Sequence, residues 1–398
     1  MENRLQIPQG VSDFYGDTAY GKRRIEDTLR GCFLKRGFEE VETPSLEYFD
    51  TFKGEMGGIR EESTVRFFDQ DGRMLALRPD LTMPVARMAA VRPGRTGVQR
   101  YCYIGNAYGM EQEYGMKRRE FTQAGCELLG AEGPEADAEI LLTAAQALLS
   151  LGIQDFVLDL GHVGFLQAVC QDVGLSPEQT AIVGALLDEK NETELAAYLE
   201  VQGLDEAAIG HFTELVYLFG DESVLDRARK RFPIPGCTAI VEYLERVCAI
   251  VKAMELPFTV SVDLGMAPNL DYYTGMVFRG MSPLLGFSLL SGGRYDTLMA
   301  QFARPMAAVG FAMGVGNALY VLERMEVLPK RPRLDCLIGC QEGGEELFLQ
   351  ASQLQQEGKT VALSYAKTQE AFLEEARRLQ PACGLYYRDG KLTARWEV

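Results

Sequence analysis

Two neighbouring strand-forming segments, residues 100–108 and 118–129, restrict the possible folds most, because together they predict an antiparallel hairpin. Side chains alternate across a strand. One face of the second strand carries Arg119, Phe121, Gln123, Gly125 and Glu127. The other face carries Thr122, Ala124, Cys126 and Leu128. The second face is apolar and suits packing against helices. The first presents a carboxamide and a carboxylate, with a glycine between them that leaves room for a small ligand.

A second informative segment is residues 270–275, which read Leu-Asp-Tyr-Tyr-Thr-Gly. This run resembles the histidine-recognition motif of histidyl-tRNA synthetases, but Pro268 stands where that motif has an arginine. The hairpin itself resembles motif 2 of the same family, in which an arginine follows the aromatic residue that ends the first strand. Here Gly109 follows Tyr108.

The resemblance continues in two further places. Residues 291–317 are similar to a glycine-rich run and motif 3 of the family, and Asn317 takes the position of the arginine that closes motif 3. Residues 41–44 resemble the end of motif 1. The resemblance covers residues 1–325 and implies an α+β fold, with a class II synthetase-like antiparallel sheet flanked by helices. Without the three arginines, the chain resembles one branch of the family, the regulatory subunits of ATP phosphoribosyltransferase.

The resemblance also implies a site for free histidine. The residues that it places there are Asp80, Thr82, Gln123, Glu127, Tyr272, Tyr273 and Tyr295. Asp80 would neutralise the ligand ammonium group by a charge-assisted hydrogen bond, and Thr82 and Gln123 would supply further acceptors. Asp80 replaces the glutamate usual in the family, so its reach is one methylene shorter.

The imidazole of the ligand would meet the remaining site residues. Glu127 would accept a hydrogen bond from one ring nitrogen and Tyr273 would bond the other, while Tyr272 and Tyr295 would form walls. Without the resemblance, these residues are also compatible with purely structural roles. The Glu127 face could be a solvated sheet face, and Asp80 could be an early-turn helix residue that the helix dipole favours.

Amino-acid activation would bring a triphosphate next to the ligand carboxylate. Phosphate groups need Arg, Lys or a metal to hold them and to stabilise the transition state. Each lost buried charge partner costs about 2–5 kcal/mol, so the lost arginine positions at Gly109, Pro268 and Asn317 predict no catalytic activity.

The leading hypothesis is therefore a non-catalytic regulatory subunit that binds histidine and dimerises through the motif 1 region. As the resemblance implies, it would assemble with a short-form ATP phosphoribosyltransferase catalytic subunit, the enzyme of the first step of histidine biosynthesis. It would activate that subunit and mediate histidine feedback.

Two other functions stay open at this point. One is an active histidyl-tRNA synthetase with unusual site residues, which would show histidine-dependent pyrophosphate–ATP exchange. The other is an RNA-binding sensor module, which would bind tRNA in a salt-sensitive way. The formal net charge of −17 argues against sequence-independent binding of nucleic acid, because such binding needs clustered Lys and Arg.

Composition and motifs exclude several other classes. The nine cysteines form no Cys-x-x-Cys pair, and Cys336 and Cys340, four residues apart, have neither of the two histidines, His162 and His211, nearby, so we expect no metal site. No phosphate-loop or other cofactor motif occurs, so we expect no cofactor. The N-terminus lacks the apolar core of a signal peptide, and no apolar stretch reaches about 18 residues. These features predict a cytoplasmic protein with reduced cysteines and no contact with a membrane.

The pattern of residues predicts three parts along the chain. Residues 1–325 would form the histidine-binding core, interrupted at about 164–255 by a helical insertion rich in Ala, Leu and Glu. Residues 326–332 would form a linker around two prolines. Residues 333–398 read as strand, helix, strand, helix, strand, which predicts a small α/β domain.

Overall fold

The computed structural model describes residues 5–52, 64–92, 97–113, 116–266, 273–342, 344–388 and 391–397. The chain divides into two compact units, Met1–Leu328 and Pro329–Val398. Each unit has its own sheet and its own apolar core. Pro268 and Tyr272 lie outside the described residues.

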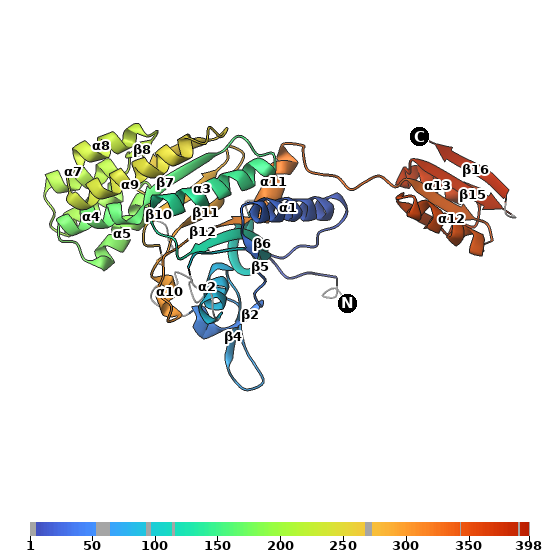
Figure 1. Ribbon diagram of the computed structural model, residues 1–398, viewed down its shortest axis with the longest axis horizontal. Coiled ribbons are helices and arrows are strands. Elements are labelled where there is room, and N and C mark those ends of the chain that lie inside the picture. The colour runs from blue at the N-terminus through green and yellow to red at the C-terminus, as the bar shows by residue number, and fades with distance from the viewer. Residues whose placement is uncertain are drawn as a thin grey trace. The chain divides into compact units, whose positions relative to one another are not determined.

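A mixed sheet forms the centre of the first unit (Figure 1). In spatial order its described strands are β1 (Glu39–Glu40), β5 (Gln99–Glu113), β6 (Met116–Leu129), β12 (Ala308–Gly314), β11 (Ser288–Arg294), β10 (Met276–Met281), β7 (Val157–His162), β9 (Thr259–Asp263) and β8 (Phe219–Gly220). β1 pairs with β5, and β7 with β9, in parallel; the other neighbours are antiparallel. The predicted hairpin is confirmed as β5 and β6, with Tyr103 in register with Gly125.

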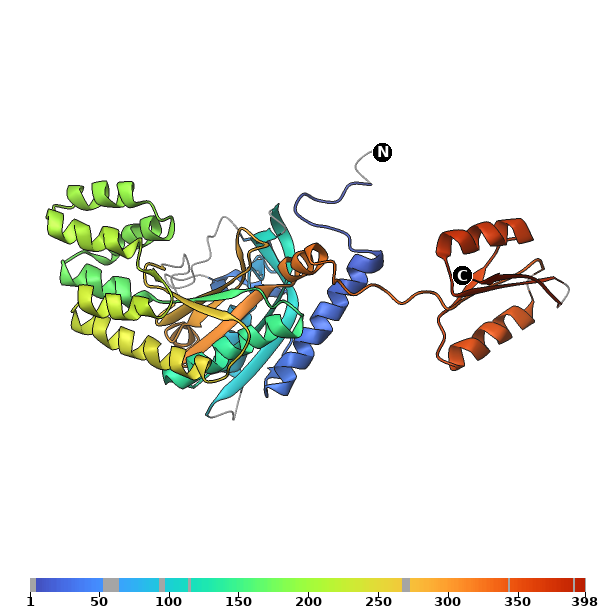
Figure 2. The same ribbon diagram turned by 90° about the horizontal axis from the view of Figure 1, so that it is seen from above.

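Long helices cover one face of this sheet. They are α1 (Gly16–Lys35), α3 (Gly133–Ser150) and α11 (Val315–Arg324), and Figure 2 shows α1 lying along the sheet. α1 buries Ile25, Leu29 and Phe33, which recur at helical spacing, and Gly37 stops the chain's helical path with φ +81°. As predicted, Ala124, Cys126 and Leu128 pack into this helix-covered core.

The opposite face carries shorter elements. They are α2 (Thr82–Val91), α10 (Leu298–Gln301), the 3₁₀ turn Phe49–Phe52 and a small antiparallel sheet of β2 (Leu46–Tyr48), β4 (Met74–Leu77) and β3 (Arg66–Phe68). With the central sheet they enclose a second apolar cluster, which includes Tyr101, Tyr103 and Tyr295. Gln123 and Glu127, two of the residues predicted for the ligand site, lie on this face because of the alternation along β6.

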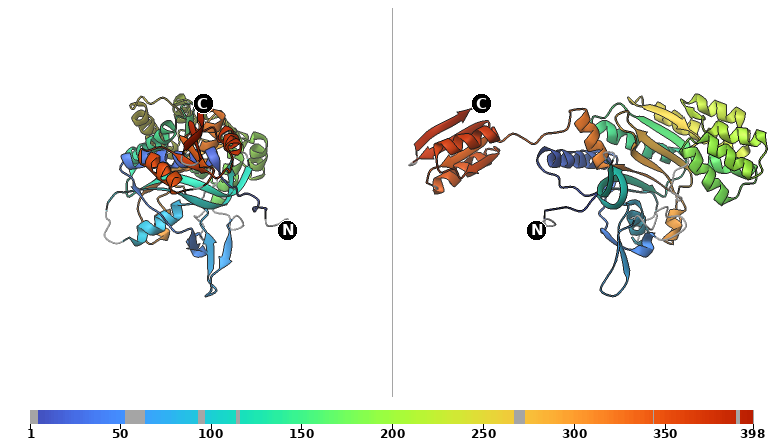
Figure 3. Two further views of the ribbon diagram at one scale, coloured as in Figure 1. Left: turned by 90° about the vertical axis from the view of Figure 1, so that its right-hand side faces the viewer. Right: turned by 180° about the vertical axis from the view of Figure 1, so that it is seen from behind.

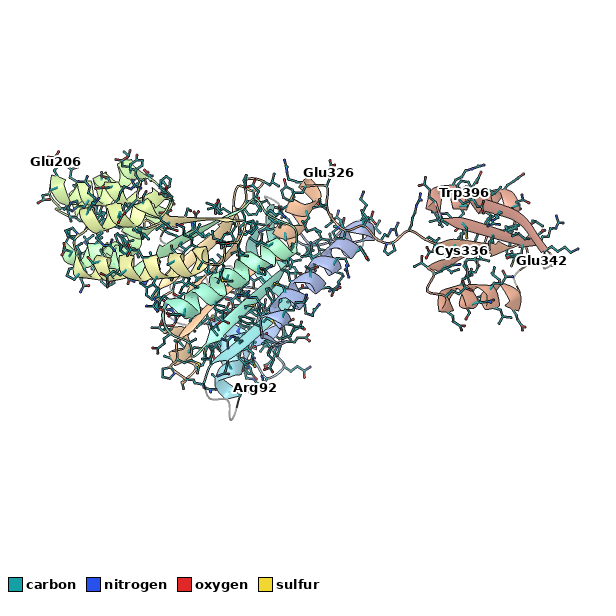
Figure 4. The ribbon with its side chains drawn as sticks, turned by 45° about the horizontal axis from the view of Figure 1, so that its top comes forward. Arg92, Glu206, Glu326, Cys336, Glu342 and Trp396 are labelled. Carbon is teal, nitrogen blue, oxygen red and sulfur yellow. The ribbon has the colours of Figure 1, made fainter. Side chains whose placement is uncertain are left out.

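A group of helices lies at one end of the central sheet (Figure 3). The group comprises α4 (Val163–Asp172), α5 (Pro177–Asp188), α6 (Glu192–Val201), α7 (Glu206–Leu215), α8 (Ser223–Arg231) and α9 (Pro235–Lys252). Ser176 begins α5 with a capping box, in which its hydroxyl accepts from the Gln179 N–H and the Gln179 side chain accepts from the Ser176 N–H. Figure 4 marks Glu206, the first residue of α7.

The second unit is a four-stranded sheet between two helices. Its elements are β13 (Cys336–Cys340), α12 (Glu345–Gln356), β14 (Val361–Ser364), α13 (Gln369–Leu379), β15 (Cys383–Arg388) and β16 (Lys391–Glu397). The first five match the predicted series of elements. β16, which carries the Trp396 labelled in Figure 4, was not predicted, because charged residues interrupt its few apolar ones.

The described residues contain no helix with the length and apolar character needed to cross a bilayer. Over the same residues, no group of three or more His, Cys, Asp or Glu side chains could hold a metal ion. All nine cysteines are free thiols.

A buried ion pair joins α3 to the central sheet. The Arg294 Nε donates to Asp137 Oδ1 at 3.0 Å, and the Tyr243 hydroxyl of α9 donates to Asp137 Oδ2 at 2.6 Å. The Asp137 side chain is fully buried, and that of Arg294 is 8% exposed. This network therefore ties α3, β11 and α9 together in a region that water does not reach.

Replacing Arg294 by methionine would leave Asp137 buried without its counter-charge. We expect the free energy of unfolding to fall by about 3–5 kcal/mol, measured by urea denaturation. Arg30→Met is the matched control, because Arg30 pairs with Glu40 at 2.8 Å on the surface and its loss should cost below about 1 kcal/mol. Equal losses in the two variants would contradict the structural role of the buried pair.

Candidate ligand-binding site

Glu127 lies at the centre of the site, on β6 and almost wholly buried. Two tyrosine hydroxyls donate to its carboxylate: Tyr103 of β5 to Oε1 at 3.1 Å, and Tyr295, which follows β11, to Oε2. Each oxygen of Glu127 thus already has a donor within the protein.

The sheet makes room for these groups with glycines. Gly310 of β12 is in register with Glu127, and a methyl group on Gly310 would lie 1.7 Å from Glu127 Oε2. A methyl group on Gly125 would lie 2.5 Å from the Tyr103 hydroxyl oxygen. The expectation that Gly125 leaves room for a ligand is therefore wrong in this structure, because the Tyr103 side chain fills that space.

The start of α2 brings two more expected residues to this cluster. Asp80 Oδ1 accepts the backbone N–H of Met83 at 3.0 Å, which is the helix-terminal role that the sequence had left open. Thr82 is buried, and its hydroxyl lies 3.5 Å from that of Tyr103. Asp80, Thr82 and Glu127 therefore gather around Tyr103.

The electrostatics of this cluster are unusual. Burial raises the pKa of Glu127 to about 7, although its two tyrosine partners oppose the rise, and the nearby charge of Asp80 adds to it. Burial also raises the pKa of Asp80 to about 6, although the backbone N–H groups that bond to Asp80 lower it. Within the described part of the chain, no Lys or Arg forms an ion pair with either carboxyl group. Two acids therefore lie together here, and no cation of the described residues pairs with them.

Two amide side chains extend the site along the same face. Gln123 of β6 is in register with Gly314, and a methyl group on Gly314 would lie 3.1 Å from the Asn317 Nδ2. The Asn317 Nδ2 donates to the Ser288 carbonyl at 3.5 Å. Gln123 Oε1 and Asn317 Oδ1 are buried and accept no hydrogen bond from the residues described. Gly109, another of the three lost arginine positions, is buried within β5.

Tyr273 lies farther along the sheet. Its ring covers Gly293, where an added methyl group would lie 2.8 Å from the ring carbons. It also lines a cavity beside β10 and β11. That Tyr273 bonds the second ring nitrogen of a bound histidine stays a prediction.

The structure thus unites Asp80, Thr82, Glu127 and Tyr295, and it adds Tyr103, which was not among the residues predicted from the sequence. The sequence did contain a feature that could have pointed to Tyr103 as a site residue. An aromatic residue directly across a strand pair from a glycine commonly lies over that glycine, but the pairing of Tyr103 with Gly125 depends on a register that the sequence did not specify.

Comparison with known proteins gives consistent matches along the chain. The family model described as histidyl-tRNA synthetase matches residues 10–317. A protein of Acetivibrio thermocellus named ATP phosphoribosyltransferase regulatory subunit is 37% identical over 353 residues, covering 88% of this chain and 84% of that protein. A protein of the same name from Thermoanaerobacter sp. (strain X514) is 36% identical and covers 91% of this chain and 95% of its own length.

Solved structures agree with these matches. A structure described as an ATP phosphoribosyltransferase regulatory subunit/histidyl-tRNA synthetase from Bacillus halodurans has a TM-score of 0.84, at 27% identity over 98% of this chain and 99% of its own. Histidyl-tRNA synthetase from Nostoc sp. PCC 7120 has a TM-score of 0.78 at 22% identity, covering 96% and 91% of the two chains, and shows the fold alone. The predicted class II synthetase-like fold is confirmed.

The raised pKa of Glu127 predicts how stability changes with pH. Below the ordinary pKa of 4.5, both the folded and the unfolded chain hold this proton, and the stabilisation from Glu127 is fully present. As the pH rises through about 7, the folded chain loses the proton, and the stabilisation is lost with it.

Glu127→Gln removes this titration. Between about pH 5 and about pH 8 the free energy of unfolding of the native chain should therefore fall by about 3 kcal/mol relative to the variant. Urea denaturation at a series of pH values measures the difference. Parallel pH profiles for the two proteins would show that Glu127 titrates normally.

Proposed function

The chain belongs to the family of ATP phosphoribosyltransferase regulatory subunits, and on this premise we propose that it binds free histidine and regulates a separate catalytic chain without catalysis of its own. The catalytic chain would be a short-form ATP phosphoribosyltransferase, acting in the first step of histidine biosynthesis. Histidine bound to the regulatory chain would then lower the activity of the assembly.

The observation that carries the histidine proposal is the pair of acids without a cation. Burying a carboxylate without a partner is costly, so such a site favours a ligand that brings positive charge and hydrogen-bond donors. Histidine brings an ammonium group for Asp80 and an imidazole N–H for Glu127. The raised pKa of Glu127, about 7, would return toward its ordinary value when the ligand supplies that donor.

The same site is poorly equipped for adenylate formation. Gly109 has no side chain, and Asn317 carries a neutral amide whose oxygen has no described hydrogen-bond donor. A triphosphate placed beside Asp80 and Glu127 would add negative charge to two carboxyl groups. These features support a subunit that kept the amino-acid end of a synthetase site and lost its nucleotide end.

The tyrosines supply a physical route from binding to regulation. Tyr103 and Tyr295 each donate to one oxygen of Glu127, and each oxygen has a second acceptor position. We propose that the imidazole N–H displaces one of the two hydroxyls rather than sharing an oxygen with it. Tyr103 belongs to the hairpin and Tyr295 follows β11, so the displacement would shift groups on two strands. Histidine can control a partner only if it binds more tightly in one state of the assembly than in the other, and this exchange of donors offers two such states.

We further propose that the chain self-associates as a dimer through the region of residues 41–44. These residues follow β1, at the edge of the central sheet. Arg78 is buried there and donates to the Thr43 carbonyl at 2.5 Å, which fixes this segment against the strand that leads to Asp80. The dimer contact would thus lie one short segment away from the ligand site.

Calorimetric titration with free L-histidine tests the ligand. The native chain should bind histidine, and Glu127→Gln should weaken binding by about tenfold to a hundredfold, the cost of losing a hydrogen bond to a charged group. Glu120→Gln is the matched control, because Glu120 lies on the same strand but is exposed and accepts a hydrogen bond from the Asn106 side chain at 2.9 Å. Unchanged affinity in Glu127→Gln would overturn the imidazole assignment, and an absence of saturation in the native chain would overturn the histidine site.

Co-purification with the short-form transferase tests the regulatory role. The mixture should form a complex whose transferase activity exceeds that of the catalytic chain alone and falls when histidine is added. The isolated chain should show no histidine-dependent exchange between pyrophosphate and ATP. Substantial exchange would instead identify an active synthetase.

A further inference from the structure

A separate cavity lies on the same face of the central sheet, beyond Tyr273 from Glu127. Its volume is about 420 Å³. It lies between the C-terminal end of α5 and strands β10 and β11. Its polar lining residues are Asp188, Tyr273, Arg279, Ser288 and Ser291, and Val277, Met281 and Phe287 form apolar walls.

One ion pair crosses this cavity. Arg279 Nη2 of β10 donates to Asp188 Oδ1 of α5 at 2.8 Å. The side chains are 33% and 20% exposed, so both remain within reach of a ligand. The cavity thus offers one guanidinium and one carboxylate side by side.

These two groups have hydrogen-bonding capacity to spare. Among the described residues, Arg279 makes one hydrogen bond, and Asp188 accepts only that one. The Ser288 and Ser291 hydroxyls form no hydrogen bond within the same described set. The pair fastens α5 to β10 and leaves its remaining donors and acceptors to water or to a ligand.

A neighbouring ion pair fulfils that fastening role. Lys190, just after α5, donates to both oxygens of Asp263 on β9, at 3.1 and 3.0 Å. It joins the same end of α5 to the sheet but does not line the cavity. Asp159 of β7 is in register with Arg279 and adds a third carboxyl group to this region. The region therefore holds three acids and two bases.

We propose that this cavity is a second amino-acid site, which takes the zwitterionic head of a free α-amino acid. The ligand carboxylate would bond to Arg279 and the serine hydroxyls, and its ammonium group would bond to Asp188. Its side chain would lie against Val277, Met281 and Phe287. This site shares Tyr273 with the residues predicted to bind histidine but uses none of the groups around Glu127, so it goes beyond the proposed function.

The charge balance selects this class of ligand. A phosphate or nucleotide would meet one cation flanked by carboxyl groups and would be repelled. A simple cation would bond to Asp188 but would gain nothing from Arg279, and an apolar molecule would use neither charged group. A zwitterion satisfies both signs at once. The volume falls in the lower part of the range for small-molecule pockets, about 300–1,000 Å³.

Binding there would act on the helical group. The ligand must insert its own charges between Asp188 and Arg279, so it would replace the direct contact of α5 with β10 by a bridged one. The position of α5 would then depend on whether the cavity is occupied, while the Lys190 pair keeps α5 attached.

Titration calorimetry with L-leucine tests the proposal, because leucine has a zwitterionic head and an apolar side chain but no imidazole for Glu127. The native chain and Glu127→Gln should bind leucine equally. Arg279→Gln and Asp188→Asn should each weaken it by about tenfold or more, the loss expected when a charged hydrogen bond is removed. Lys190→Gln, the matched control, should leave the affinity unchanged.

L-leucinamide, which lacks the carboxylate, should bind the native chain about as weakly as leucine binds Arg279→Gln. An absence of leucine saturation, or equal affinity in the native chain and Arg279→Gln, would overturn this site. A parallel titration with L-histidine separates the two proposals. Histidine binding that responds to Glu127→Gln without any leucine binding would leave the proposed function intact and remove the second site. Leucine binding without histidine binding would support the second site and overturn the proposed histidine site.

Discussion

Three close approaches between side chains and glycines in the central sheet make the ligand site possible. Tyr103 lies over Gly125, Glu127 over Gly310, and the Tyr273 ring over Gly293. Any larger residue at these glycines would collide with the side chain above it. Strand register decides two of these approaches, because Tyr103 pairs with Gly125 and Glu127 with Gly310, whereas Tyr273 precedes β10 and reaches Gly293 from outside the sheet. Shape, burial and electrostatics of the site all follow from that register.

Burial in this register explains the chemistry of the site. Glu127 lies deep in the sheet, receives hydrogen bonds from two neutral hydroxyls and has no described counter-cation, so its carboxyl group favours the protonated form. Asp80 experiences the same effect more weakly. A synthetase that handles a nucleotide must surround such acids with cations. Here no cation of the described residues pairs with the acids, in keeping with a family whose members are named regulatory subunits.

Local patterns predicted much of the architecture. The amphipathic stripe of α1, the β5–β6 hairpin and, residue for residue, β14 and α13 were expected from periodicity and turn residues. Short strands without a clear alternation of apolar and polar residues were not expected from the sequence. β3 has three exposed residues, and β16 has its apolar residues separated by charges, so both depend on pairing with a neighbour that local periodicity cannot reveal.

The sequence by itself determined the fold class, the faces of β6 and the presence of acids where a synthetase family has a histidine site. It also showed that Gly109 and Asn317 stand where cations are expected. Only the tertiary structure decided that Tyr103 fills the space over Gly125, and that Asp188 meets Arg279 across a cavity. The reason is distance along the chain. Alternation and motifs act over a few neighbouring residues, whereas these contacts join separate strands and helices whose register is set by the packing of the whole unit.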